Sequence, residues 1–329
     1  MFMRSLITAF FIFCCASGFT SAADKLVTIH SARVMSQSMP WIAEEAGLFK
    51  KYNLDHQLVF VASSTMVTAA ILGGDAEMTL TGGIGNVRGY IQGATDLVFV
   101  GGVKNVMTQS IVAGGNIKKP EDIKGKRVAV SRIGSNTHYF TIQALRRSGM
   151  EPNKDFTFIQ TGGDPESLAA LLSKQIEVAT LTAPSDAKAL SAGYHYVVYG
   201  PDLKIPYAAT AFVTKRSVIA KRPEVIGRFM QAMAEAAKIL HSDKEFVYKV
   251  MGKQLRLTDR SILDAAYNAE IKALEPRLVL KSEAIEAILG EIAATDPRAK
   301  KVKPQELIDS RYLDEMEKSG FFNQLWAKK

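Results

Sequence analysis

Short β-branched runs alternate with helical patterns along this chain, and the whole alternation occurs twice. Strands are predicted at residues 25–30, 57–61, 78–80 and 97–100, with helices between them. The same order returns about one hundred residues later, with strands at 126–130, 156–161 and 178–181. Such alternation is typical of a mostly parallel α/β sheet. The sequence therefore predicts two α/β lobes of similar plan.

The remainder of the chain is predicted to be helical. One further strand is expected at 212–214, and helical patterns follow from Ser217 onward, the longest over 223–240. The apolar faces of these helices need a sheet to pack on, and we assign them to the first lobe. The chain then crosses between the lobes near Ser110 and near Ala209. This gives a first lobe of residues 24–109 plus 209–329 and a second lobe of residues 110–208.

Residues 1–23 have the layout of a secretory signal peptide. Arg4 supplies a positive start, residues 6–16 are apolar but too few to span a membrane, and small residues precede Asp24. We therefore predict export to the periplasm and a mature chain that begins at Asp24. Cys14 and Cys15 both lie in the removed segment, so the mature chain would hold no disulfide, thiolate metal site or cysteine nucleophile.

Length and charge narrow the function further. A chain of 329 residues with 47% apolar and 22% charged residues is globular and suits two packed lobes. Its net charge of +8 is spread along the sequence. Proteins that bind nucleic acids usually concentrate basic residues on one face or stripe. Nucleic acid is therefore not an expected partner.

Sequence motifs for cofactors and catalysis are weak. Residues 83–89, Gly-Ile-Gly-Asn-Val-Arg-Gly, miss the dinucleotide fingerprint because Arg88 stands where the third glycine belongs. The five histidines of the chain form no pairs at helical spacing, which argues against a metal site built from local pairs. We expect no cofactor, no metal and no enzymatic activity. An exported enzyme assembled from residues distant in sequence stays open as an alternative.

Five loops between a strand end and a helix start carry the binding signal: 31–39, 63–65, 81–83, 131–138 and 182–184. Ligands of open α/β sheets bind outside these strand ends, where each helix N-terminus favours an anion by ~0.3–1 kcal/mol. Small polar residues there supply donors and let the backbone approach closely. We predict that the two groups of loops face each other across a cleft. The predicted ligand-binding residues are Gln37, Ser64, Thr65, Gly82, Gly83, Arg132, Ser135, Asn136, Thr137, His138 and Thr182.

Charged and aromatic residues near these loops suggest the solute. Arg33 and Arg132 occupy matching places in the two lobes, and either could hold a carboxylate, sulfonate or phosphonate through two hydrogen bonds. Met35, Trp41 and Tyr139 would suit a planar or apolar body. We therefore expect a solute with an acidic head and a modest organic tail. A neutral heteroaromatic solute is the alternative.

Four segments resemble the substrate-binding proteins of ABC importers for nitrate, taurine, alkanesulfonates and thiamine-pyrimidine precursors. Residues 41–49 are similar to the Ala-x-x-x-Gly-x-Phe pattern of this group, and residues 69–77 to its helix-turn-strand segment. Residues 120–130 resemble the Asp-Leu-Lys-Gly-Lys-x-Val-Ala-Val entry to the second lobe. Residues 134–138, Gly-Ser-Asn-Thr-His, are similar to a Gly-Ser-x-x-His ligand loop. The resemblance covers most of residues 24–250.

This resemblance implies a type II periplasmic binding protein fold with a helical C-terminal region. It also implies a monomer that closes on a small solute and delivers it to an ABC permease and its ATPase. Asn53, where the group usually has Gly, and residues 174–177 depart from the pattern but are not expected to touch ligand. A sensory module, or an enzyme of the same fold, is the competing function. The enzymatic branch uses a cysteine-rich motif that a thiol-free mature chain would lack.

Overall fold

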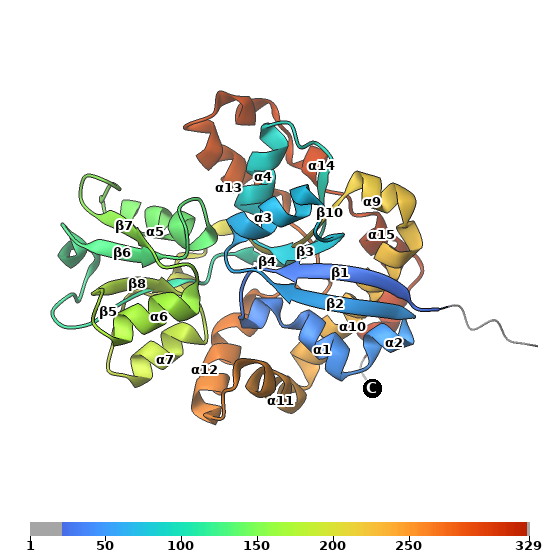
Figure 1. The fold of residues 1–329 in the computed structure, drawn as a ribbon, viewed down its shortest axis with the longest axis horizontal. Helices are drawn as coiled ribbons and strands as arrows, with labels where there is room; N and C mark the ends of the chain where they lie inside the picture. The colour runs from blue at the N-terminus through green and yellow to red at the C-terminus, as the bar shows by residue number, and fades with distance from the viewer. Residues whose placement is uncertain (1–21, 328–329) are drawn as a thin grey trace, which may run out of the picture.

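Residues 22–327 form two five-stranded sheets that lie side by side in a computed structural model of the chain (Figure 1). The predicted signal peptide falls outside the described residues, apart from Ala22 and Ala23. We call the first sheet with the helices packed on it the first lobe, and the second sheet with its helices the second lobe. The chain passes from one sheet to the other after strand β4 (Leu97–Val106) and returns before strand β10 (Pro206–Lys215).

The first sheet has the order β2-β1-β3-β10-β4. Strand β1 pairs in parallel with both β2 and β3, whereas β10 is antiparallel to β3 and β4. Four strands therefore point one way, and the returning strand is inserted among them in reverse. Besides β4 and β10, its strands are β1 (Asp24–His30), β2 (Leu54–Phe60) and β3 (Met78–Thr81).

The second sheet repeats this plan with the order β7-β6-β8-β5-β9. Strand β6 is parallel to β7 and β8, and β5 is the reversed strand between β8 and β9. The reversed strand in each sheet, and strands β5 and β9, are not predicted by the sequence patterns. The bounds are β5 (Ser110–Ala113), β6 (Arg127–Val130), β7 (Thr157–Gln160), β8 (Val178–Leu181) and β9 (His195–Val198).

Short helices follow the strands of both lobes and set the edges of the region between them. In the first lobe they are α1 (Met39–Glu45), α2 (Leu48–Lys51), α3 (Ser64–Gly73) and α4 (Gly83–Ile91). In the second they are α5 (Asn136–Arg146), α6 (Asp164–Leu172), α7 (Ser185–Ser191) and α8 (Gly200–Leu203). Short 3-10 turns lie at Met35–Gln37, Pro120–Ile123, Ile271–Ala273 and Pro297–Lys301.

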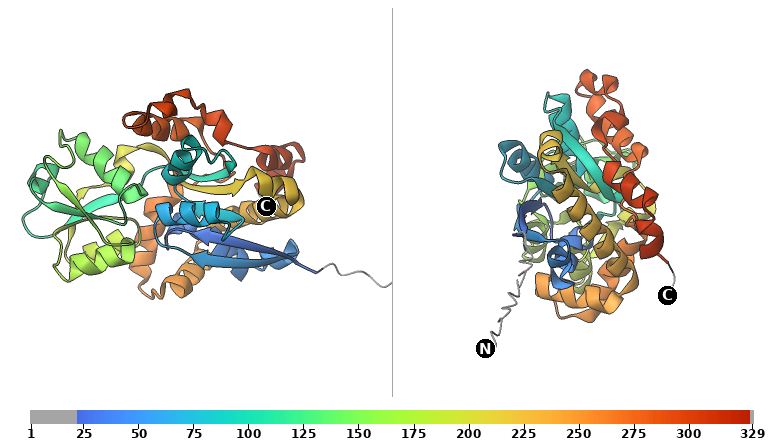
Figure 2. Two further views of the ribbon diagram at one scale, coloured as in Figure 1. Left: turned by 45° about the horizontal axis from the view of Figure 1, so that its top comes forward. Right: turned by 90° about the vertical axis from the view of Figure 1, so that its right-hand side faces the viewer.

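The C-terminal helices, coloured from yellow to red, gather around the first sheet (Figures 1 and 2). The longest, α10, buries Phe229 and Met233 against the core shared with α1. Across residues 22–327, no helix has both the length and the apolar character that crossing a membrane requires. The helices are α9 (Arg216–Lys221), α10 (Pro223–Ser242), α11 (Lys244–Leu255), α12 (Arg260–Glu270), α13 (Ser282–Ala293), α14 (Pro304–Leu307), α15 (Arg311–Lys318) and α16 (Phe321–Leu325).

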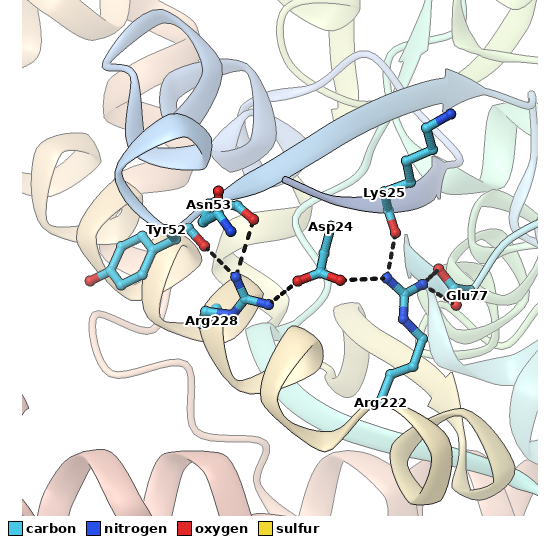
Figure 3. A network of polar contacts seen from close by, with 7 residues as sticks. All are labelled: Asp24, Lys25, Tyr52, Asn53, Glu77, Arg222 and Arg228. Atoms are coloured by element: carbon cyan, nitrogen blue, oxygen red, sulfur yellow. Dashed lines mark hydrogen bonds and ion pairs between the residues drawn. The ribbon is translucent and has the colours of Figure 1, made fainter. Parts of the chain in front are cut away.

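Asp24, the predicted first residue of the mature chain, is held to α10 by two arginines (Figure 3). Arg228 bonds its carboxylate and also donates to the carbonyl of Asn53 at 3.1 Å. Arg222 pairs with Glu77 at 2.6 Å. Asn53 has a φ of 51°, a left-handed conformation that Asn adopts more readily than most residues. This explains how Asn53 replaces the Gly that is usual at this turn.

Candidate functional site

A small cavity lies between the two lobes, at the ends of the strands from which the predicted binding loops leave. Its volume is about 70 Å³, far below the roughly 300–1,000 Å³ of pockets that hold drug-sized ligands. Both lobes form its wall, and so do the segments that connect them. The cavity therefore suits a solute of only a few heavy atoms.

Six of the predicted binding residues line this cavity, and five do not. The six are Gln37, Ser64, Ser135, Asn136, Thr137 and Thr182. The other five, Thr65, Gly82, Gly83, Arg132 and His138, lie outside its wall. Direct contact of the six with a solute stays a prediction.

The two glycines are packing positions rather than part of the cavity wall. A methyl group added at Gly82 would place its carbon 2.0 Å from Oδ1 of Asn136, in the other lobe. One added at Gly83 would lie 2.9 Å from the Ile288 side chain. Thr65 is close by, with its hydroxyl 3.1 Å from the Ser63 hydroxyl. These residues form a seam between the lobes, because their missing or small side chains let other groups approach.

The predicted arginine is the wrong one of the pair. Arg132 is exposed and does not reach the cavity, whereas Arg33 lines it with its guanidinium carbon 4.7 Å from the centre of the Phe60 ring. Phe60 also supplies the aromatic surface that was expected from other residues. Met35, Trp41 and Tyr139 are instead buried in the hydrophobic cores.

His138 organises the loop before α5 and takes no place in the cavity wall. Its Nδ1 accepts a hydrogen bond from the Gly134 N–H at 3.2 Å, and its ring packs on Phe158 at 4.4 Å. Burial lowers the pKa of His138 to about 4, and the nearby Arg88 adds to this effect. The imidazole is therefore neutral at pH 7, which leaves Nδ1 free to accept that bond.

Hydroxyl groups fix the second-lobe loop around the cavity. The Ser131 hydroxyl donates to the Ser135 hydroxyl at 2.9 Å and lies 3.0 Å from that of Thr137. Ser135 is the N-cap of α5, as Ser63 is of α3. Two helix N-termini, one from each lobe, thus border the same cavity. Their unpaired N–H groups and helix dipoles favour negative charge there.

Three lining residues were missed by the sequence analysis: Lys104, Gln109 and Asp164. Lys104 is 1% exposed, and its Nζ donates to Glu270 at 2.7 Å and to Thr108 at 2.5 Å. The charged residue inside an apolar strand sequence was the available signal. Its partner Glu270 is 166 residues away, so sequence spacing could not identify the pair.

Two lining side chains carry buried polar atoms that have no hydrogen-bond partner among residues 22–327. They are Oγ of Ser64 and Oε1 of Gln109, in residues that are 4% and 5% exposed. An unsatisfied buried group of this kind costs about 1–3 kcal/mol. A polar solute in the cavity would remove that cost.

Asp164 brings a carboxylate to the cavity wall from the first turn of α6. Its Oδ2 accepts a hydrogen bond from the Thr182 N–H at 2.8 Å. Burial raises the pKa of Asp164 to about 6, and the hydrogen bonds from Thr182 oppose that rise. Within the described part of the chain, no group of three or more His, Cys, Asp or Glu residues could hold a metal ion.

Asn136 ties the second lobe to the returning strand β10. Its Nδ2 donates to the Ala209 carbonyl at 2.9 Å, and its Oδ1 accepts from the Tyr207 hydroxyl at 3.0 Å. The lobes also meet farther out, where a Cβ added at Gly163 would lie 3.7 Å from that of Ala62. The two lobes are thus in close contact around the cavity.

Known proteins share this architecture. A solved structure from Bordetella bronchiseptica RB50 matches 91% of this chain and 98% of its own, with a TM-score of 0.80 and 20% identity. The alkanesulfonate-binding protein of Xanthomonas axonopodis pv. citri, solved bound to MOPS, matches 88% of this chain and 99% of its own, with a TM-score of 0.72 and 18% identity. The predicted type II periplasmic binding protein fold is therefore confirmed.

The sequence comparisons agree with the fold. The taurine-binding periplasmic protein of Escherichia coli K12 is 28% identical over 182 residues, which is 53% of this chain. The match spans about half, 54%, of that relative's length. The family model described as NMT1/THI5 like matches residues 38–245, well over half of the chain. The chain therefore belongs to the NMT1/THI5-like family.

Proposed function

We propose that this protein is the periplasmic solute-binding component of an ABC importer. It captures a small organic acid, sulfonate-like or carboxylate-like, between its lobes and delivers it to the permease. The observation that carries the proposal is a small polar cavity walled by both lobes, in which the Ser64 hydroxyl is buried without a partner. The taurine-binding and alkanesulfonate-binding relatives support the same class of solute.

Capture follows from the placement of donors on both sides of the cavity. The Ser64 hydroxyl and the N-terminus of α3 offer hydrogen bonds from the first lobe, and the N-terminus of α5 offers them from the second. An acid that accepts from both lobes binds the closed arrangement better than an open one. Its differential affinity stabilises closure.

A small acid fits this cavity better than a neutral heteroaromatic solute. Phe60 is the lining aromatic ring, and the Arg33 guanidinium already lies over it. The other walls near the loops are serine, threonine and amide side chains. A planar heterocycle would leave many of these donors unpaired, which lowers its affinity.

Ser64→Ala should weaken the binding of the acid by about 1.5–3 kcal/mol, the value of a hydrogen bond to a charged group. The probe is the best acid from a thermal-shift screen of short sulfonates and carboxylates, where a solute at 100 times its Kd adds about 2.7 kcal/mol of stability. Calorimetry of both forms measures the difference. Arg132→Ala is the matched control and should bind normally, because Arg132 lies outside the cavity. Equal losses in both variants, or no acid that binds, would contradict the proposal.

Export gives a separate expectation for the location. The protein recovered from the periplasm of its native host should have an intact mass that begins at Asp24, because small residues precede this position. Mass spectrometry of the periplasmic fraction measures it. Retention of residues 1–23, or a lipid on Cys14 or Cys15, would count against the predicted processing.

A further inference from the structure

The cavity wall contains hydrogen-bond acceptors that an acidic head cannot use. Asp164 presents a carboxylate, and Gln109 presents Oε1 without any protein partner. Both groups accept hydrogen bonds, so an anionic group placed against them would be repelled. They need a donor from the solute.

Asp164 also lacks a positive partner. In the described part of the chain, no Lys, Arg or His side chain lies within ion-pair distance of its carboxylate, and its bonded partner is Thr182. The lysine of the cavity, Lys104, is already paired with Glu270 at 2.7 Å. The charges that act on Asp164 from α6 and α7, Glu166 and Asp186, are negative.

This carboxylate is charged under physiological conditions. Burial raises the pKa of Asp164 only to about 6, so most molecules carry the negative charge at pH 7. A buried charge without a partner is costly. A cation brought in by the solute would be stabilised by the same group.

We infer that Asp164 and Oε1 of Gln109 form a subsite for a protonated amino group, so the solute is a small zwitterion. Its acid is held by the donors around Ser64, and its ammonium group donates to Asp164 and Gln109. The subsite rests on the proposed function, because it assigns the second end of the same captured solute. It divides the cavity into a donor part and an acceptor part.

Matched solute pairs test the subsite. Taurine and ethanesulfonate differ in the amino group, as do β-alanine and propionate, and all four are titrated into the full-length exported protein by calorimetry. We expect the amino member of the pair that binds to bind about 10- to 100-fold more tightly, the range of a hydrogen bond to a charged group. Its affinity should fall as the pH drops below about 6, since protonation removes the charge of Asp164.

Asp164→Asn should bring the affinity for the amino solute down to that of its partner without the amine, and should leave the latter unchanged. Glu166→Gln is the control, because it removes a negative charge from the same turn of α6 at an exposed position. Melting temperatures without solute check that both variants fold, and the wild-type comparison stands if Asp164→Asn does not. A solute without an amine that binds as tightly as its amino partner would overturn the subsite alone. Failure of all four to bind would contradict the acid-binding function as well, and the subsite with it.

Discussion

Glu270→Ala should lower the free energy of unfolding by about 3–5 kcal/mol, the cost of leaving a buried charge without its partner. Glu270 and Lys104 are each 1% exposed, and their charged atoms lie 2.7 Å apart. Removal of the carboxylate leaves the Lys104 ammonium with only the Thr108 hydroxyl. Urea unfolding followed by circular dichroism measures the loss.

Two comparisons separate burial from the ion pair itself. The double variant Lys104→Met with Glu270→Leu should recover most of the stability, because apolar replacement of a buried pair is often neutral or better. Glu245→Ala breaks the exposed pair with Arg260, whose side chains are 69% and 65% exposed, and should cost less than about 1 kcal/mol. A loss in Glu270→Ala no larger than that in Glu245→Ala would refute the expectation.

Gly82→Ala should hold the lobes apart and reduce solute affinity by more than about tenfold, a penalty above 1.4 kcal/mol. The added carbon would sit 2.0 Å from Oδ1 of Asn136, which is closer than atoms can approach. Asn136 cannot simply turn away, because its amide is bonded to Tyr207 and Ala209. Small-angle scattering, with and without the acid identified by thermal shift, should show a larger radius of gyration than in the wild type.

A second substitution should relieve the contact. Gly82→Ala combined with Asn136→Ala removes the opposing amide and should bring the radius of gyration back toward the wild-type value. Gly290→Ala is the control, because no atom lies within 4 Å of the added carbon; alanine at this helical position should stabilise by about 0.5–1 kcal/mol. Wild-type scattering and affinity in Gly82→Ala would show that the seam does not limit closure.

The fold was predictable wherever local pattern determines structure. Runs of β-branched residues mark β1 and β6, and the polar loops after them mark the strand ends where the cavity lies. The reversed strands β5 and β10 were not predictable in direction, since that depends on how the chain returns from the other sheet. The first half of β10, with Tyr207 and Ala209, also lacks a β-branched run.

The candidate site was predictable only in part, because its polar pairs are distant in sequence. Gly82 looks like a position for close approach of a solute, and the group that approaches is the Asn136 side chain. Asp164 looks like an ordinary first-turn acid, and its position in the cavity wall depends on packing between α6 and the end of β8. Residue type indicates what a side chain offers, whereas the tertiary contacts decide what receives it.

The approach of Ala62 to Gly163 has a consequence for control of the protein by redox chemistry. The 3.7 Å between their Cβ positions falls within the roughly 3.5–4.5 Å of unstrained disulfides. Gly163 has a φ of −161°, an extended conformation that any residue adopts. Ala62→Cys together with Gly163→Cys would therefore join the lobes covalently across the mouth of the cavity. In such a variant, the thiol–disulfide balance of the medium would decide when a captured solute is released, whatever its concentration outside.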